Sequence, residues 1–392
     1  MGIARRLALG RLVSLGGGSA AYIALVAAIY GATGSALWVS AAIFSSVVAS
    51  VASAPFAGWI GDRFDRRGVL VGADVAAAGV SLALAATAKH PVALVVLLGV
   101  SSVAQSPFEP ASASAVPSVV PEPDVPHANA LLAAASSIGY LVGPLIGGAV
   151  LGAGASPALL FGIDAATFAF SAAVVASIRR PFGRGSTEEH PGVLAGLRLI
   201  VRERALRVPV LAATVSLMGV GIVDVASYPL SLDLHGGAAG YGVMTGLLGG
   251  GGLLGAALAA QVLHAAPSRV LVAAFAAGAA GLALAGAAPI LAIGLVGMAF
   301  AGAGRGLGDV AAVTLIQARA PDEVRSRVFA ARDGAAHVAF SVSAFTGGLL
   351  VEAAGPRGAF AAAAAFGSGA ALLAARATPP QRTRPSRSRE SP

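Results

Sequence analysis

Long apolar stretches alternate with short polar connections along the whole chain. Each stretch holds about 20 residues, which as a helix is long enough to cross a hydrocarbon core of ~30 Å. The pattern predicts twelve membrane-spanning helices. They fall at about 12–30, 37–57, 69–88, 92–116, 128–151, 158–178, 208–230, 241–262, 270–287, 290–316, 328–351 and 358–375. The expected fold class is an all-α membrane protein.

Composition supports this interpretation and excludes several kinds of chemistry. Of 392 residues, 56% are hydrophobic and only 11% are charged, with a mean hydropathy of +0.81. A soluble protein of this composition would expose far too much apolar surface. The chain has no cysteine, which excludes disulfides and cysteine-ligated metals. No nucleotide-binding signature or catalytic constellation is present, so we expect no cofactor, no metal and no enzyme.

The distribution of positive charge predicts the orientation. Most of the 26 basic residues lie in the termini and in the connections after even-numbered spans, whereas Lys89 and Arg357 lie in the opposite set and Arg305 lies inside a span. Because positive loops stay cytoplasmic, we expect a plasma-membrane protein with both termini inside. The arginine-rich tail at 382–389 favours a disordered anchor near anionic lipid; binding of nucleic acid is the alternative, and we expect no such partner.

The two halves of the chain resemble each other at an offset of 200 residues. Gln105 aligns with Arg305, Glu109 with Asp309, and the pair Gly147 and Gly148 with a second glycine pair. In a membrane protein such a repeat indicates two similar bundles with a transport pathway between them. We divide the chain into bundles at 1–178 and 208–376, a linker with an amphipathic helix at 179–207, and a tail at 377–392.

A charged turn follows the second expected span. It contains Gly58, Gly61, Asp62, Arg63, Arg66 and Arg67. The glycines permit close helix packing, Asp62 can accept hydrogen bonds from free amides at a helix N-terminus, and the arginines supply cations. Such a turn can act as a gate that stabilises one conformation. The alternative is a positive turn that only sets topology.

The fifth expected span carries a stripe of glycines. Gly139, Gly143 and Gly147 recur at i, i+4 and i+8, and Gly148 follows directly. Pro144 removes a backbone donor and bends the helix. The stripe predicts a smooth face against which another helix can pack and rock. An ordinary small-residue interface is the alternative.

Ionisable side chains interrupt several expected spans: Glu109, Asp224, Arg305, Asp309 and His337. A charge at the bilayer centre costs ~2.5–3.5 kcal/mol, so we expect these groups to face a cavity or one another. Arg305 and Asp309 can form a structural pair at i, i+4. Asp224, one turn before Tyr228, is the preferred proton carrier, with a structural role as the alternative. Asp74 is expected to be structural.

The charged turn resembles the signature between helices 2 and 3 of the major facilitator superfamily. Asp62, Arg63, Arg66 and Arg67 match its charged positions, whereas Asp65 replaces its second glycine. This form of the signature, with Asp65, resembles that of exporters of enterobactin and macrolides. The glycine stripe resembles the helix-5 motif of antiporters in the same family. The resemblance implies that helices 1, 4, 7 and 10 line a central cavity. Gln105 stands where the family's helix-4 pattern has an arginine.

These observations predict a monomeric secondary transporter that works by alternating access. The expected activity is proton-coupled export of an amphipathic small molecule such as a drug, macrolide or siderophore. The expected partners are that substrate, protons and the lipid bilayer. One alternative is a facilitator or importer of the same fold without proton coupling. Another, of a different class, is a non-transporting membrane scaffold or sensor.

Overall fold

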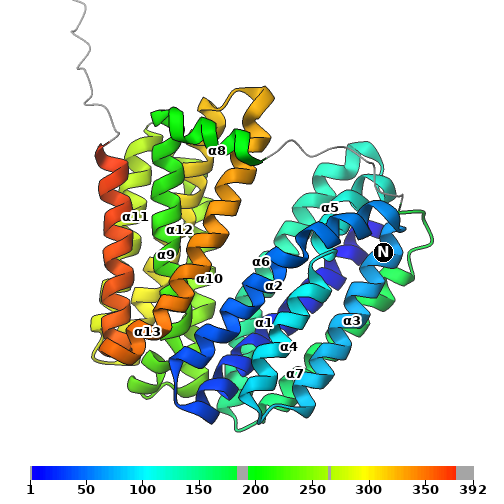
Figure 1. The fold of residues 1–392 in the computed structure, drawn as a ribbon, viewed down its shortest axis with the longest axis horizontal. Helices are drawn as coiled ribbons and strands as arrows, with labels where there is room; N and C mark the ends of the chain where they lie inside the picture. Colours follow the sequence, from blue (N-terminus) through cyan, green and yellow to red (C-terminus); the bar gives the residue numbers. More distant parts are fainter. Residues whose placement is uncertain (1, 183–192, 264–265, 377–392) are drawn as a thin grey trace, which may run out of the picture.

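A computed structural model describes residues 2–182, 193–263 and 266–376, without the side chains at 61–62, 193–196, 322–323 and 326. The described chain forms helices joined by short turns, arranged as two bundles (Figure 1). Part of the linker at 183–192, the tail at 377–392 and the side chain of Asp62 lie outside this description. The predicted all-α class with paired bundles is confirmed.

The first bundle contains seven helices and a short 3-10 turn. They are α1 (Ile3–Thr33), α2 (Ala36–Arg63), α3 (Arg66–Ala86), α4 (Pro91–Gln105), α5 (Phe108–Val119), η1 (Glu122–Asp124), α6 (Val125–Gly152) and α7 (Pro157–Ala176). Helices α4 and α5 together form the single span expected at 92–116. They separate at Ser106 and Pro107, because proline has no amide hydrogen to continue the helical ladder.

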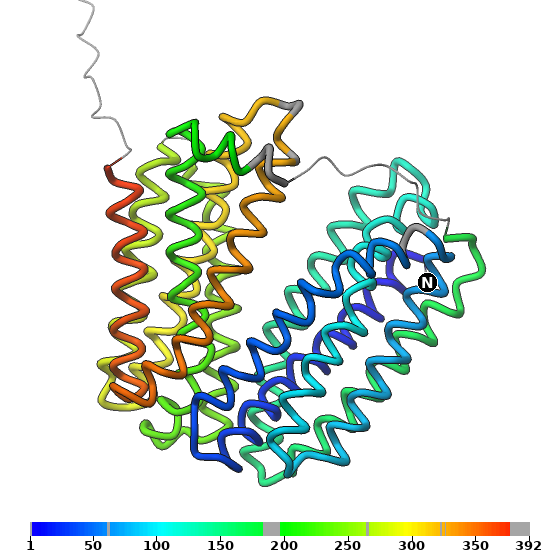
Figure 2. Tube along the Cα trace, viewed as in Figure 1, coloured from blue at the N-terminus to red at the C-terminus, as the bar shows by residue number. Residues whose placement is uncertain are grey.

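The second bundle follows the linker helix α8 (Val193–Arg202). It contains α9 (Arg204–Asp233), α10 (Gly237–Val262), α11 (Pro267–Ala287), α12 (Leu291–Arg319) and α13 (Asp322–Arg376). Figure 2 shows α13 descending and returning through a turn. At that turn Gly355 has φ of +71°, a left-handed conformation that favours glycine. This helix therefore holds both of the last two expected spans, and the described residues give eleven candidate spans rather than twelve.

The linker helix forms where the sequence predicts an amphipathic segment. Ile200 is only 4% exposed and packs with Leu206 and Val328 of the second bundle. Leu197 and Val201 are exposed although they are apolar, and Arg198 is exposed as well. The end of the molecule at which α8 lies is called the linker face below, and the other end is called the opposite face (Figure 1).

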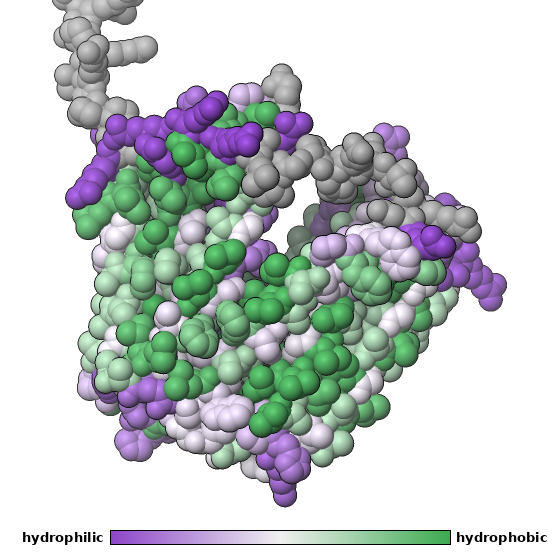
Figure 3. Space-filling model, in the orientation of Figure 1, coloured by the Kyte–Doolittle hydropathy of each residue, from purple (hydrophilic) through white to green (hydrophobic). Residues whose placement is uncertain are grey.

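The buried apolar residues show where the two bundles meet. One large core cluster joins both bundles in the half toward the opposite face, with Ile29, Phe161, Tyr241 and Phe360 among its members. Toward the linker face the cores are separate, with one cluster in the first bundle and two others in the second. The bundles are therefore packed together at the opposite face and apart at the linker face, where Figure 3 shows a hollow between them.

Candidate functional site

A cavity of about 600 Å³ lies between the bundles on the side of the linker face. Its wall draws on the expected first, fourth, seventh and tenth spans, as the family resemblance implies, and on several others. It is lined by Arg11, Ser14, Leu15, Gly18, Ser19, Tyr22, Asp74, Gln105, Phe108, Glu109, Tyr140, Pro144, Phe168, Val220, Asp224, Thr245, Leu248, Gly249, Arg305 and Phe340. The wall thus combines charged groups with aromatic rings, which suits an amphipathic ligand.

Asp224 lies in this wall and contacts the other bundle. The hydroxyl of Tyr22 on α1 donates a 2.7 Å hydrogen bond to Oδ2 of Asp224 on α9. These helices are the first of each bundle, so the bond links the two halves of the molecule directly. The sequence indicated no partner for Asp224, because Tyr22 lies 202 positions away.

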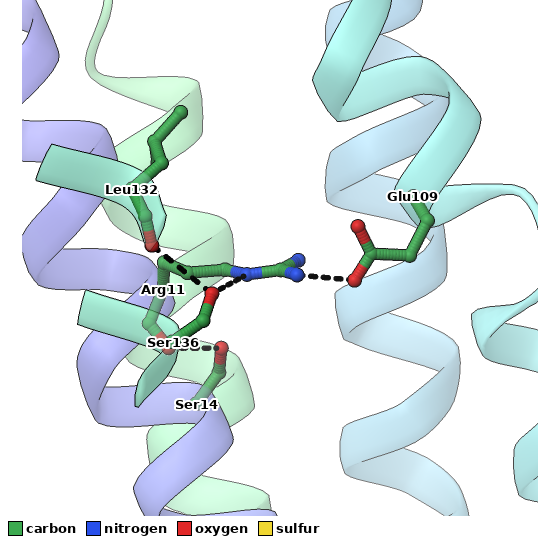
Figure 4. A network of polar contacts seen from close by, with 5 residues as sticks. All are labelled: Arg11, Ser14, Glu109, Leu132 and Ser136. Atoms are coloured by element: carbon green, nitrogen blue, oxygen red, sulfur yellow. Dashed lines mark hydrogen bonds and ion pairs between the residues drawn. The ribbon is translucent and has the colours of Figure 1, made fainter. Parts of the chain in front are cut away.

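Glu109 is held by a cation that the sequence analysis placed outside the membrane. Arg11 of α1 forms an ion pair with Glu109 of α5 (Figure 4). The guanidinium also donates from Nε to the Ser136 hydroxyl at 3.0 Å and lies 5.8 Å from the centre of the Phe108 ring. Hydropathy put the start of the first span at residue 12, whereas α1 begins at Ile3. The helix is longer because its inner end lines a polar cavity rather than lipid.

Asp74, for which a structural role is expected, lies in the cavity wall. It is 1% exposed, and its Oδ2 has no hydrogen-bond partner. Arg11 is close enough to act on it electrostatically. Asp164, by contrast, is bound by the hydroxyl of Ser81 at 2.7 Å inside the first bundle. Asp74 is therefore the acid of the first bundle that remains incompletely satisfied.

Gln105 and Arg305, which align in the sequence repeat, both line the cavity. Gln105 is the last residue of α4, and its Nε2 is buried without a partner. Arg305 lies near the middle of α12, with Asp309 one turn further along. The expected pair is not in contact, since no ion pair joins these two side chains in the described chain. Asp309 is absent from the cavity lining.

Two other predicted site residues lie away from the main cavity. Tyr228 is 9% exposed and packs edge-to-face with Tyr30 and Tyr241, at centroid distances of 5.6 and 5.4 Å, in the core that closes the opposite face. It lies there because one helical turn beyond Asp224 the bundles have already met. His337 is exposed and lines a separate hollow of about 470 Å³, which Gln105 and Glu109 also line.

The glycine stripe of α6 packs as its spacing predicts. A Cβ at Gly147 would lie 2.7 Å from the Ala20 carbonyl oxygen of α1, closer than real Cβ contacts allow. Gly139 and Gly143 face the same helix. A second stripe, formed by Pro144, Gly148 and Gly152, faces α10 in the other bundle. Gly148 therefore lies on a different face of α6 from Gly139, Gly143 and Gly147.

The repeat extends to these contacts. Gly147 packs on α1, the first helix of its own bundle, and Gly148 packs on α10, the second span of the other bundle. Gly347 correspondingly packs on α9, and Gly348 packs on α2. Both glycine pairs thus make one contact within a bundle and one between bundles, as the pseudo-symmetry of the halves requires.

The charged turn between α2 and α3 makes contacts within the first bundle. Asp65 caps α3 by accepting from the Gly68 amide at 3.3 Å. Arg66 donates to the Ser118 hydroxyl and the Phe182 carbonyl oxygen. Both partners are neutral oxygens. Asp65, which the resemblance treats as a departure from the family, therefore has a local structural role.

The other residues predicted for the turn between α2 and α3 contact backbone and aromatic groups or meet no neighbour. Arg67 donates to the Arg180 carbonyl oxygen and lies over the Phe182 ring. Arg63 lies over the ring of Trp59 at 5.7 Å. A Cβ at Gly58 would meet no atom within 4 Å, so the expected close packing is not present there. The positions of Gly61 and Asp62 lie in the last turn of α2.

Three further hydrogen bonds join the bundles at the opposite face, and none of them was predicted from the sequence. Glu352 of α13 accepts from the Ser35 hydroxyl at 2.7 Å and from the Ala36 amide at 2.9 Å. A carboxylate at the N-terminus of α2 satisfies a free amide and meets the positive end of the helix dipole. One turn further on, Ser40 donates to the Ala344 carbonyl oxygen. Ser35 before an apolar run is a readable N-cap, but Glu352 lacks a local signal.

Comparison with known proteins agrees with this architecture. A sequence model of the Major Facilitator Superfamily matches residues 7–263 and 210–392. The nucleoside transporter NupG superposes with a TM-score of 0.79 at 12% identity, covering 96% of this chain and 99% of that one. A D-xylose–proton symporter gives 0.71 at 15% identity, covering 94% and 96%. Comparison with curated protein sequences gives no match.

A third similar structure belongs to another transporter. A bacterial homologue of the human lysosomal transporter Spinster, inward-facing and unoccupied, gives a TM-score of 0.71 at 15% identity, covering 95% of this chain and 96% of that one. At such identities these likenesses concern the fold alone.

Proposed function

The chain belongs to the major facilitator superfamily, and from that premise we propose that it exports an amphipathic small molecule in exchange for protons. The fold provides a multi-pass transporter with a cavity between two bundles. The observation that supports the proposal most strongly is Asp224. This ionisable group lies in the cavity wall and is hydrogen-bonded across the bundles to Tyr22. A group so placed can exchange a proton with the cavity while it affects how the bundles meet.

The direction follows from the charge pattern and from the helix-5 stripe. Basic residues gather near the linker face, for example Arg198 in α8, Arg204 at the start of α9 and Arg319 at the end of α12. By the positive-inside rule this face is cytoplasmic, with both termini inside the plasma membrane. The described conformation then opens its cavity to the cytoplasm. The glycine stripe that packs on α1 matches the antiporter motif of the family and favours export.

Alternating access assigns a mechanical role to each face. The bundles, proposed as units at 1–178 and 208–376, rock about the cavity so that contacts at the opposite face break as others form at the linker face. Asp62 lies in the turn that would close the linker face, with Arg66 and Arg67 beside it. Asp224 lines the cavity that would hold the substrate, so its protonation and substrate binding are energetically linked.

The proposal is tested with purified protein in proteoliposomes carrying an imposed pH gradient. Uptake of three fluorescent probes is followed: dansylglycine, dansylamide and dansylcadaverine. The wild type should accumulate a probe only with the gradient. Asp224→Asn should lose that accumulation and keep exchange of probe across the membrane. Asp309→Asn provides the comparison, because Asp309 does not line the cavity. Transport that ignores the gradient in the wild type would favour the facilitator, and no movement of any probe would favour the scaffold.

A further inference from the structure

Arg305 is the one cation of the central cavity that no described protein group neutralises by contact. The charged residues of the wall are Arg11, Asp74, Glu109, Asp224 and Arg305. Arg11 is paired with Glu109 and bound to Ser136, and Asp224 is bound by Tyr22. Arg305 forms no hydrogen bond or ion pair in the described chain.

The nearest acid does not account for this arginine. Asp309 lies one turn along α12 and acts on Arg305 only at a distance. Its carboxylate lies outside the cavity lining, whereas Arg305 lines the cavity and also a small apolar pocket of about 30 Å³ beside it. Arg305 thus borders open space, whereas Asp309 does not. Intramembrane arginine costs ~2.5–3.5 kcal/mol and is retained mainly where it has a function.

The surroundings of Arg305 define what could occupy that space. Aromatic side chains from both bundles share the cavity wall, including Phe108, Tyr140 and Phe340. The small pocket beside Arg305 is bounded by Phe275, Leu282 and other apolar groups. A ligand that satisfies both features has an anionic head and an apolar or aromatic body. The guanidinium matches a carboxylate, sulfonate or phosphate through paired N–H donors.

We propose that Arg305 is the anion-binding residue of the transport site and that the substrate is an amphipathic organic anion. The proposal rests on the transporter function given above and narrows its substrate class, which otherwise includes cationic drugs. The competing site is Asp74 in the first bundle, whose Oδ2 lacks a partner and would suit an ammonium group. Arg11 cannot replace Arg305 in this role while it is paired with Glu109.

Binding of three probes with one shared aromatic body tests the assignment. Dansylglycine is anionic, dansylamide neutral and dansylcadaverine cationic at pH 7. Each is titrated into the full chain in nanodiscs of neutral phosphatidylcholine, and dansyl fluorescence is measured. A charge-assisted hydrogen bond predicts that dansylglycine binds roughly tenfold to a hundredfold more tightly than dansylamide. Equal affinities, tighter binding of dansylcadaverine, or no binding of dansylglycine would overturn the proposal.

Variants at Arg305 decide whether the preference belongs to this residue. Arg305→Gln should bind dansylglycine and dansylamide equally, with dansylamide affinity unchanged. Arg305→Lys should keep part of the preference, because the charge remains but the paired donors are lost. If Arg305→Gln binds neither probe, the test passes to Arg305→Lys. Equal affinities of Arg305→Lys for dansylglycine and dansylamide would then overturn the proposal.

A double variant separates ligand binding from charge balance within α12. If Arg305 only offsets Asp309, Arg305→Gln/Asp309→Asn should recover the wild-type preference for dansylglycine. If Arg305 binds the anion, the double variant should remain without that preference. The binding result is also independent of the transport result. Gradient-driven transport of dansylcadaverine alone would support the exporter and contradict the anion site. Binding of dansylglycine without transport of any probe would support the anion site and contradict the exporter.

Discussion

The hydroxyl of Tyr22 lies 2.7 Å from Oδ2 of Asp224, and this bond joins the first helix of one bundle to the first helix of the other. It lies at the deep end of the cavity, just before the apolar core that closes the opposite face. A movement that opens the opposite face separates the two helices and must break this hydrogen bond. The bond therefore couples the ionisation of one acid to the arrangement of the bundles.

Tyr22→Phe removes this bond and keeps the ring. Hydrogen bonds to charged groups contribute about 1.5–3 kcal/mol, and the buried acid loses its donor, so thermal stability in detergent should fall. Gradient-driven uptake should fall as well. Tyr30→Phe is the matched control, because the Tyr30 ring packs on Tyr228 and its hydroxyl makes no hydrogen bond in the described chain. Equal melting temperatures for the two variants would show that the bond contributes nothing to stability.

Gly148→Ala tests the contact between α6 and α10. A Cβ there would lie 2.8 Å from the Ala238 carbonyl oxygen and from the Gly242 Cα, so the bundles must separate. Overpacking of this kind costs about 1–3 kcal/mol. Gly162→Ala on α7 is the control, because its Cβ would meet nothing within 4 Å. That change should stabilise the helix by roughly 0.5–1 kcal/mol. Thermal unfolding should thus shift in opposite directions, and a shared sign would contradict the packing argument.

Glu352→Ala tests the closure of the opposite face. The change removes acceptors for the Ser35 hydroxyl and the Ala36 amide, and it removes a negative charge at the α2 N-terminus. A loss of about 1.4 kcal/mol would move the equilibrium between the two conformations tenfold toward opening at that face. The distance between spin labels at Ser156→Cys and Pro289→Cys measures this opening. Labelling is specific because the native chain has no cysteine.

A control variant separates this contact from a general charge effect. Glu122→Ala removes an exposed acid in η1, near the linker face, and should leave the distance between those labels unchanged. A distribution in Glu352→Ala that matches Glu122→Ala would mean that Glu352 does not hold the opposite face closed.

Much of the fold was predictable because each helix had to bury its own backbone in an apolar medium. The spans, the repeat and the face of Gly139, Gly143 and Gly147 all follow from local spacing. Arg11 was missed because hydropathy marks where lipid contact ends, and α1 continues past that point beside the cavity. Helices α4 and α5 read as one span because hydropathy does not register the break in the helix at Pro107.

The contacts between bundles were not predictable from local patterns. The Tyr22 to Asp224 bond and the Ser35 to Glu352 bond connect residues 202 and 317 positions apart. Their partners are fixed by how two separately folded bundles lie against each other. Tyr228 illustrates the same limit, since a single turn of α9 separates a cavity residue from a core residue.

The central claim, that the bundles rock about the cavity, is tested most directly by measuring distances at both faces in the same protein. One pair of spin labels at Asp124→Cys and Ala318→Cys reports on the linker face, and the Ser156→Cys and Pro289→Cys pair reports on the opposite face. The distance between the labels of each pair is measured by pulsed electron paramagnetic resonance in nanodiscs, with and without the Glu352→Ala change. The account predicts opposite responses, with the linker-face distance shortening as the opposite-face distance lengthens. Distances that change at only one face, or at neither, would contradict alternating access in this chain.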